Sequence, residues 1–272
     1  MMAYDDGHGV KAISEAFARA RAQGRAALIT YLTLGYPSPA DSLELVNALQ
    51  VGGADLIELG VPFSDPLADG PIIQRASHVA LQAGMTPRGC LELVPRLRGA
   101  GVTVPLLLMG YYNPIHAYGL EAYVRDCAFA GVDGLIVPDL PPEEAGPLRE
   151  ACSPRSGRGQ GLALVFLVAP TSGEGRIAQI AAATQGFLYL VSRLGTTGTG
   201  QGPGEELAGQ LALVRAHART PVAVGFGLSR PDQMRQLAPQ VDGLIVGSAV
   251  VERAAEGAAA LRDYVRSLRA AL

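Results

Sequence analysis

Short apolar runs alternate with helical patterns along the whole chain. In several runs every position is apolar, which is the pattern of a parallel strand that is buried on both faces. The runs predict eight strands, at Ala27–Thr33, Leu56–Gly60, Pro105–Gly110, Gly134–Pro138, Leu162–Val168, Phe187–Ser192, Val222–Gly227 and Gly243–Gly247. Between them apolar residues recur with the helical period, for example in Ala40–Val51, Leu120–Ala130, Ile177–Thr184, Glu205–Ala218, Pro231–Leu237 and Glu252–Ala271.

Eight strand-helix units in about 250 residues favour a closed (β/α)8 barrel over an open sheet. An open doubly wound sheet is the alternative, but no GxGxxG motif follows the first strand. We therefore expect an α/β protein with a single (β/α)8 TIM barrel domain over residues 1–272, the barrel proper covering about 26–270.

Three segments fall outside the regular units. Val10–Gln23 has an amphipathic pattern and is expected to form an extra N-terminal helix that caps the bottom of the barrel. Met85–Arg98 is expected to add a second helix to the second unit, with Thr86 as its N-cap. The polar stretch Ser153–Gly161 is interpreted as a surface insertion without chemistry.

Composition excludes several classes of function. Of the 272 residues, 49% are hydrophobic and 17% are charged, which is typical of a globular protein. A net charge of −3 gives no basic surface for nucleic acid. No apolar run approaches the length of a membrane span and no signal pattern opens the chain, so we expect no membrane partner and a cytoplasmic location. The three cysteines lack CxxC spacing and predict buried free thiols.

The run ELGVPFSDPLADGPIIQRA, Glu58–Ala76, is the most informative stretch. With a period of two, Glu58 shares a strand face with Leu56 and Gly60, so an acid stands where an apolar residue is expected. Prolines stiffen the loop that follows, which carries Asp65 and Asp69. An ion pair with an arginine is the structural alternative for Glu58. Its place at the C-terminal end of a barrel strand, where the active sites of such barrels gather, favours catalysis.

Glycine-rich turns follow the last three predicted strands. VGFGLS and VGSAVV follow strands seven and eight, the usual place of a phosphate site in this fold, and single out Gly227, Gly247 and Ser248. SRLGTTGTGQGPG follows the sixth strand and is interpreted as a mobile lid, with a plain flexible loop as the alternative.

Lysine and histidine are rare in the chain, and this limits the kinds of catalysis that the site can perform. The single lysine, Lys11, precedes the first strand, which argues against Schiff-base chemistry. The four histidines are scattered, so no metal site is expected. Carboxylates acting as general acid and base on a phosphorylated substrate remain. Three tyrosines at strand positions are candidates for an aromatic pocket, with core packing as the default: Tyr31, Tyr111 and Tyr189.

Taken together, these motifs resemble the tryptophan synthase alpha chain family. The resemblance runs in unbroken order from about Tyr31 to Val251 and includes TLGYP, the Glu58–Ala76 run, LMGYYNP, GVDGLIVPDLPPEE, SRLGTTG, GFGLS and VGSA. It implies a (β/α)8 barrel that cleaves indole-3-glycerol phosphate to indole and glyceraldehyde 3-phosphate, and that works with a beta chain in an alpha2beta2 tetramer. It implies no cofactor in this chain, with pyridoxal phosphate only in the beta chain.

The resemblance also assigns residues. Glu58 matches the general acid–base residue and Asp69 the carboxylate that binds the indole N–H. The implied substrate-binding residues are Tyr31, Tyr111, Ile136, Tyr189, Thr197, Gly198, Phe226, Gly227, Gly247 and Ser248, and the implied beta-chain contacts are Pro62, Asp65, Pro66 and Pro141. Thr196 stands where the lid motif of the family usually has valine, and the Ser153–Gly161 stretch is longer than usual. A lyase that works without a partner and a non-catalytic barrel subunit are the alternatives.

Overall fold

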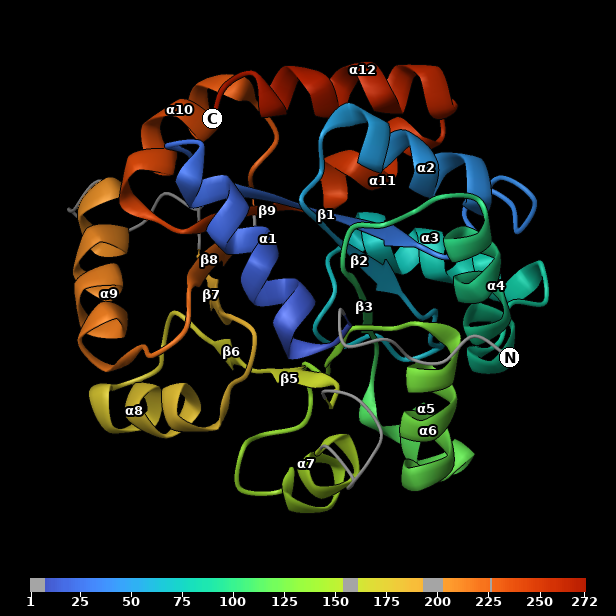
Figure 1. Ribbon diagram of the computed structural model, residues 1–272, viewed down its shortest axis with the longest axis horizontal. Coiled ribbons are helices and arrows are strands. Elements are labelled where there is room, and N and C mark those ends of the chain that lie inside the picture. The colour runs from blue at the N-terminus through green and yellow to red at the C-terminus, as the bar shows by residue number, and fades with distance from the viewer. Residues whose placement is uncertain (1–7, 154–160, 193–202, 226) are drawn as a thin grey trace.

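Nine parallel strands occupy the centre of the molecule and helices surround them (Figure 1). The computed structural model describes residues 8–153, 161–192, 203–225 and 227–272. The strands are β1 (Ala27–Thr33), β2 (Leu56–Gly60), β3 (Leu106–Met109), β4 (Gly134–Ile136), β5 (Ala163–Val165), β6 (Leu167–Val168), β7 (Leu188–Val191), β8 (Val222–Gly225) and β9 (Gly243–Val246). They pair in the order β5-β4-β3-β2-β1-β9-β8-β7-β6.

The two outermost strands in this order, β5 and β6, are consecutive in the chain, so the sheet returns on itself as a barrel. The sequence predicts one strand at Leu162–Val168, which is wrong in detail, because pairing changes at Phe166. The Phe166 N–H bonds to Thr184 Oγ1 at 3.0 Å instead of continuing the ladder. β5 pairs with β4 on one side of this break, and β6 pairs with β7 on the other. The prediction of a (β/α)8 barrel is confirmed.

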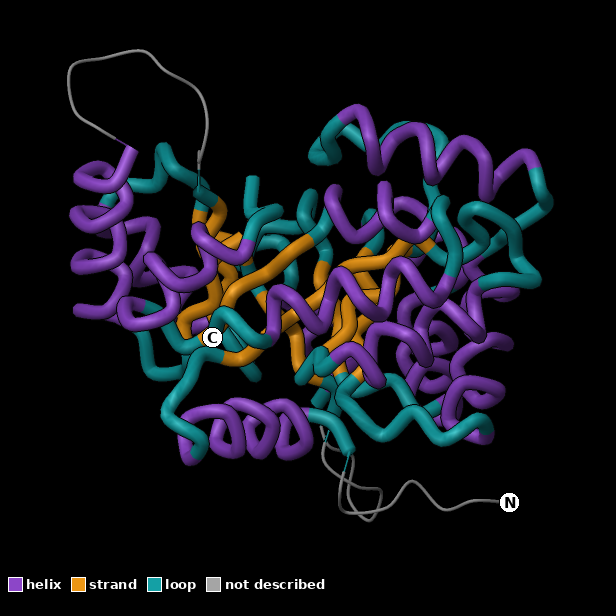
Figure 2. Tube along the Cα trace, turned by 90° about the horizontal axis from the view of Figure 1, so that it is seen from above, coloured by secondary structure: helices purple, strands orange, loops and turns teal. Residues whose placement is uncertain are grey.

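The helices form an outer ring around the strands (Figure 1), and in the view turned by 90° they flank the strands on both sides (Figure 2). They are α2 (Ser42–Gly52), α3 (Pro71–Gln82), α4 (Pro87–Gly99), α5 (Tyr112–Tyr118), α6 (Leu120–Ala130), α7 (Gly146–Cys152), α8 (Glu174–Ala183), α9 (Pro203–His217), α10 (Pro231–Leu237), the short 3-10 helix η1 (Ala238–Gln240), α11 (Ser248–Ala254) and α12 (Ala258–Arg269). The N-cap assigned to Thr86 is confirmed, since its hydroxyl accepts from the Gly89 N–H. The single helix predicted at Glu252–Ala271 is wrong: the chain turns at Gly257, with φ 97°, between α11 and α12.

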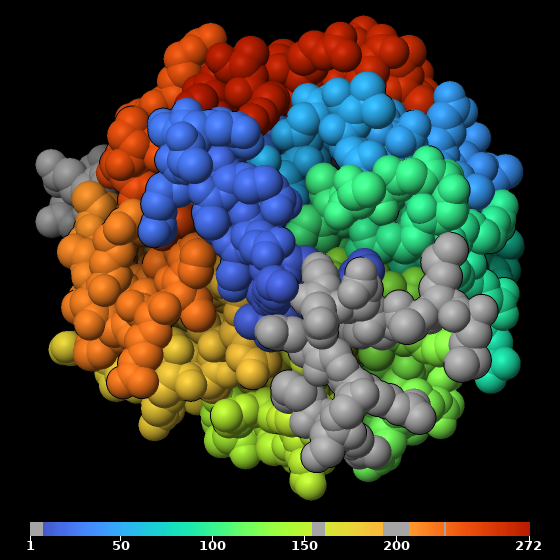
Figure 3. Space-filling model, in the orientation of Figure 1, coloured from blue at the N-terminus to red at the C-terminus, as the bar shows by residue number. Residues whose placement is uncertain are grey.

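The extra N-terminal helix, α1 (Val10–Ala22), closes one end of the barrel. It crosses the centre of the face in Figure 3, as predicted for Val10–Gln23. Ile13 and Phe17 belong to the same buried cluster as the inward side chains of the strands. The Phe17 ring lies 5.6 Å from that of Phe187, and a Cβ on Gly243 would come within 2.9 Å of the Phe17 ring. Because Phe187 and Gly243 lie at strand starts, α1 plugs the N-terminal end of the barrel.

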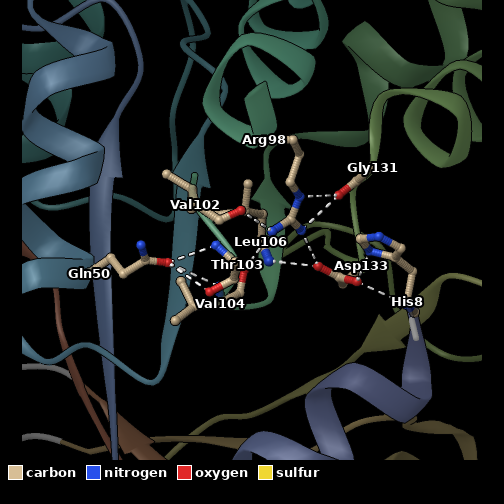
Figure 4. A network of polar contacts seen from close by, with 10 residues as sticks. His8, Gln50, Arg98, Val102, Thr103, Val104, Leu106, Gly131 and Asp133 are labelled. Atoms are coloured by element: carbon tan, nitrogen blue, oxygen red, sulfur yellow. Dashed lines mark hydrogen bonds and ion pairs between the residues drawn. The ribbon is translucent and has the colours of Figure 1, made fainter. Parts of the chain in front are cut away.

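A buried polar network anchors the start of α1 (Figure 4). The Asp133 carboxylate, just before β4, accepts hydrogen bonds from the Gly9 N–H at 2.9 Å and the Leu106 N–H at 2.9 Å. His8 Nδ1 lies 3.2 Å from the same carboxylate, and the Arg98 guanidinium donates to it at 2.6 Å. Since Asp133 is 1% exposed, this network ties α1, α4 and two strand starts to one buried charge.

Two further predictions concern the cysteines and the absence of a membrane-spanning helix. Cys90, Cys127 and Cys152 are buried and free, as predicted. Among the described residues, no helix has the length and apolar character needed to cross a membrane.

Candidate active site

A cavity of about 260 Å³ opens at the C-terminal ends of the strands, opposite α1. Its walls come from β1, β2, β3, β7 and the segments that follow β2, β8 and β9. The described residues that line it are Tyr31, Glu58, Asp69, Ile72, Ile73, Met109, Tyr189, Gly227, Leu228, Ser229, Gly247, Ser248, Ala249 and Glu252. The structure therefore brings together seven of the residues that the sequence predicts for the site.

Glu58 lies at the floor of this cavity. Its strand neighbours Ile57 and Leu59 pack into the layer between strands and helices, so the period of two turns Glu58 into the barrel. The side chain is fully buried, and neither carboxylate oxygen has a hydrogen-bond partner among the described residues. Burial raises the pKa of Glu58 to about 8. The ion-pair alternative fails, because no arginine contacts this carboxyl in the described structure, and Glu58 is instead a neutral acid near pH 7.

Asp69 enters the cavity from the loop between β2 and α3. The Tyr111 hydroxyl donates to Asp69 Oδ2 at 3.1 Å and accepts from the Ala68 N–H at 2.9 Å. Gln74 Nε2 donates to the Asp69 carbonyl at 2.9 Å and steadies the loop. Burial raises the pKa of Asp69 to about 6, and the hydrogen bond from Tyr111 acts against this shift.

The two carboxyl groups thus titrate in different ranges. Between about pH 6 and pH 8, Asp69 is ionised while Glu58 keeps its proton. One cavity then holds a proton donor and a fixed negative charge at the same time, which is the arrangement that divides acid and base roles between two carboxyl groups.

The other end of the cavity can bind an anion through backbone N–H groups, without the help of a cationic side chain. None of its described lining residues is lysine, arginine or histidine. Gly247 precedes α11, and no side chain of the described residues caps that helix, so the Ser248 and Ala249 N–H groups point to the wall without a side-chain acceptor there. Gly227 has φ 78°, a conformation that glycine adopts without strain, and it turns the chain into the cavity.

The other residues that the sequence predicts for the pocket are not among the described residues that line the cavity. Tyr111 lies behind Asp69, with its ring 5.3 Å from that of Phe63. Ile136 is fully buried on β4 and is not among the lining residues. Thr197, Gly198, Phe226 and most of the lid lie outside the described residues, as does the stretch 154–160.

Sequence reasoning missed several wall residues. Ile72 and Ile73 lie in the first turn of α3, a few residues after Asp69, and Met109 ends β3 on the inward face. The alternation of strand residues places Met109 on the inward face, so the sequence did contain a signal for this residue. The sequence contains no such signal for Ile72 and Ile73, because their contact with the cavity depends on how α3 packs on β1.

The predicted partner-contact residues differ in exposure. Asp65 is exposed and Pro66 and Pro141 are partly exposed, whereas Pro62 is buried in this chain. Leu67, at the same loop tip, is 93% exposed, which is unusual for a large apolar side chain.

Comparisons with known proteins agree with this geometry. The family profile described as tryptophan synthase alpha chain matches residues 17–271. The tryptophan synthase alpha chain of Roseiflexus sp. is 50% identical over 262 residues, covering 94% of this chain and 98% of the relative. That of Chloroflexus aurantiacus is 47% identical over 268 residues, covering 96% and 98%.

Solved structures give the same result. A chain of ligand-free tryptophan synthase from Mycobacterium tuberculosis superposes with a TM-score of 0.85 at 39% identity, covering 95% of this chain and 98% of that one. The tryptophan synthase alpha subunit of Legionella pneumophila gives 0.84 at 33% identity, covering 96% and 97%. With nearly the whole length matched in both sequence and fold, the chain belongs to the tryptophan synthase alpha chain family.

Proposed function

We propose that Glu58 and Asp69 carry the reaction of this family, the cleavage of indole-3-glycerol phosphate to indole and glyceraldehyde 3-phosphate. The observation that carries the proposal is the pair of carboxyl groups that line one cavity. Burial supports it, because it raises the pKa of Glu58 to about 8 and that of Asp69 to about 6, so that only Glu58 keeps its proton near pH 7. A non-catalytic barrel subunit would not need a buried, unpartnered acid, which is costly to maintain.

The chemistry requires both groups. Cleavage of the bond between indole C3 and the glycerol carbon needs a proton on C3, and this places positive charge on the ring nitrogen. Glu58 delivers that proton, and Asp69 stabilises the charge on the nitrogen. The Glu58 carboxylate then accepts the proton of the glycerol hydroxyl as the aldehyde forms. Glu58 is thereby protonated again at the end of the cycle.

The remaining parts of the cavity hold the substrate. Backbone N–H groups at Gly227, Gly247 and Ser248 are our candidates for the phosphate, because glycine lets the anion approach the chain closely. Tyr31 and Tyr189 line the apolar part and suit the indole ring. Thr197, Gly198 and Phe226 are added on the family resemblance alone.

The alpha chain of this family acts with a beta chain, in which the family's pyridoxal phosphate resides; the alpha chain itself needs no cofactor. We propose that Asp65, Pro66 and Pro141 contact the beta chain, with Pro62 supporting the loop from beneath. We also propose a cytoplasmic location.

Replacement of Glu58 tests the function. Glu58→Gln keeps the shape of the side chain and removes the proton, so kcat for indole release should fall by about 10²–10⁴-fold. Glycerol 3-phosphate should still bind as it does to the wild-type chain, with and without a beta chain. Turnover within a few-fold of wild type would show that another group transfers the proton.

A further inference from the structure

Tyr31 and Glu58 lie side by side on neighbouring strands of the barrel. The two residues are register partners on β1 and β2, and both side chains line the cavity. Two residues nearer the mouth, Thr33 pairs with Gly60. Tyr31 is 5% exposed, so the phenol belongs to the floor of the cavity and not to its rim.

Gly60 provides the space for this phenol. A Cβ on Gly60 would lie 2.0 Å from the Tyr31 hydroxyl oxygen and 2.5 Å from its ring carbon Cζ. The Tyr31 ring therefore extends over the Gly60 backbone at the end of β2. There its hydroxyl meets Thr33 Oγ1 at 3.3 Å, and either oxygen can donate. Thr33 therefore holds the phenol in place whether the threonine hydroxyl donates the hydrogen bond or accepts it.

Glu58 needs a donor at one stage of the reaction. Once it has given its proton to the indole ring, it is a buried carboxylate without a partner among the described residues. An ion in that position is costly unless a hydrogen bond reaches it. The described titratable groups of this region are Tyr31, Tyr189, Tyr111, Asp69 and Glu252, and no cation is among them.

Among these groups the phenols can donate, and Tyr31 is the one whose strand position is paired with Glu58. Burial, and after it the charge of Asp69, raises the pKa of Tyr31 far above its ordinary value, with a smaller contribution from Glu58 itself. The phenol keeps its proton throughout the working pH range and can only donate to the carboxylate. Asp69 and Glu252, when ionised, can only accept.

We propose that Tyr31 is a positioning residue for this reaction: Thr33 donates to the phenol oxygen, and the Tyr31 hydroxyl donates a hydrogen bond to the Glu58 carboxylate formed during turnover. The phenol proton stays on Tyr31, so only the direction of hydrogen bonding changes. The inference rests on the role proposed above for Glu58.

Tyr31→Phe tests this directly, since it keeps the ring and removes the hydroxyl. A hydrogen bond to a charged group supports a loss in kcat of about tenfold or more. The basic limb of the pH dependence of kcat/KM should also move upward by about one unit, because the ionised form of Glu58 loses a donor. The KM for indole-3-glycerol phosphate should stay within about twofold.

Two further variants make the test decisive. Thr33→Val keeps the phenol and removes its hydrogen-bond partner, so the basic limb should move in the same direction by less. Tyr118→Phe removes a phenol on the outer ring, bonded to Asp126, and should change neither kcat nor the limb. If Tyr31→Phe does not fold, Thr33→Val alone decides.

A folded Tyr31→Phe protein with wild-type kcat and an unmoved basic limb would overturn the inference while the proposed function stands. A wild-type chain that releases no indole, with or without a beta chain, would overturn the proposed function and this inference with it.

Discussion

At the scale of single residues, the site depends on a carboxyl group that the fold keeps neutral. An unpartnered glutamate in a barrel core lowers the free energy of unfolding at neutral pH. Substitutions that remove such an unfavourable group commonly stabilise a protein while they reduce its activity. Glu58 therefore connects catalysis with stability.

The first prediction concerns the stability of the Glu58→Gln variant. Burial raises the pKa of Glu58 from 4.5 to about 8, so the unfolded chain releases this proton at lower pH than the folded protein. Between these values the native state binds more protons, and its stability falls as pH rises, by about 3 kcal/mol at pH 7. Glu58→Gln removes this dependence. Its advantage over wild type in urea unfolding should grow from about pH 5 to pH 8.

An exposed glutamate serves as the control for this prediction. Glu121→Gln replaces an exposed side chain on α6 and should change the unfolding free energy much less than Glu58→Gln at neutral pH. A difference between Glu58→Gln and wild type that did not change with pH would mean that Glu58 is ionised in the folded protein.

Residue-scale prediction from sequence succeeds where one side chain breaks a strong pattern. Glu58 interrupts an apolar strand, and it lines the cavity as the pattern predicts. Asp69 was distinguished from Asp65 only by the family resemblance, and it also lines the cavity. Ile73 was missed because it is an ordinary apolar helix residue, and only the packing of α3 against the barrel mouth exposes it to the cavity.

At the scale of elements, the helix that closes the barrel is held by charge as well as by packing. Asp133→Asn leaves the Arg98 guanidinium, which is 17% exposed, without its carboxylate partner. It also replaces the carboxylate that accepts from the Gly9 and Leu106 N–H groups with a neutral amide. Breaking a buried pair by removing one partner is strongly destabilising, so we expect a loss of about 3 kcal/mol in unfolding free energy. Urea unfolding measures it.

The matched control is an exposed pair. Asp232→Asn removes the partner of Arg230 on the surface, where side chains are well solvated, and should leave the unfolding midpoint nearly unchanged. Equal midpoints for Asp133→Asn and Asp232→Asn would contradict the anchoring role of the network.

Element boundaries show why sequence alone falls short at this scale. Apolar runs predict the strands well because both faces of each strand are buried. The break at Phe166 depends on the Thr184 hydroxyl, which is 18 residues away in sequence, and no local pattern contains it. The break at Gly257 did have a local signal, a glycine inside a helical pattern, which the sequence interpretation passed over.

At the scale of the whole molecule, the loop between β2 and α3 carries both a residue proposed for catalysis and residues proposed for partner contact. Asp69 at its end enters the cavity, while Asp65 and Leu67 at its tip are exposed. A partner that orders the tip would also fix Asp69. The single domain over residues 1–272 and the lid stay predictions at this scale.

Asp65→Ala tests this coupling. Indole formation by the isolated chain should be the same for Asp65→Ala and wild type, because Asp65 does not line the cavity. Activation by a saturating beta chain should fall, since the loop would lose the contact that we propose the partner uses to order it. Rates with and without beta chain measure the effect, and equal activation of mutant and wild type would leave Asp65 with a structural role only.

The central claim is that Glu58 acts as a protonated acid beside an ionised Asp69. The most direct measurement is the pH dependence of kcat/KM for indole formation from indole-3-glycerol phosphate. We predict a bell-shaped profile, with an acidic limb near pH 6 from Asp69 and a basic limb near pH 8 from Glu58. A profile that stays flat from about pH 5 to pH 9 in a folded, active chain would contradict this division of roles.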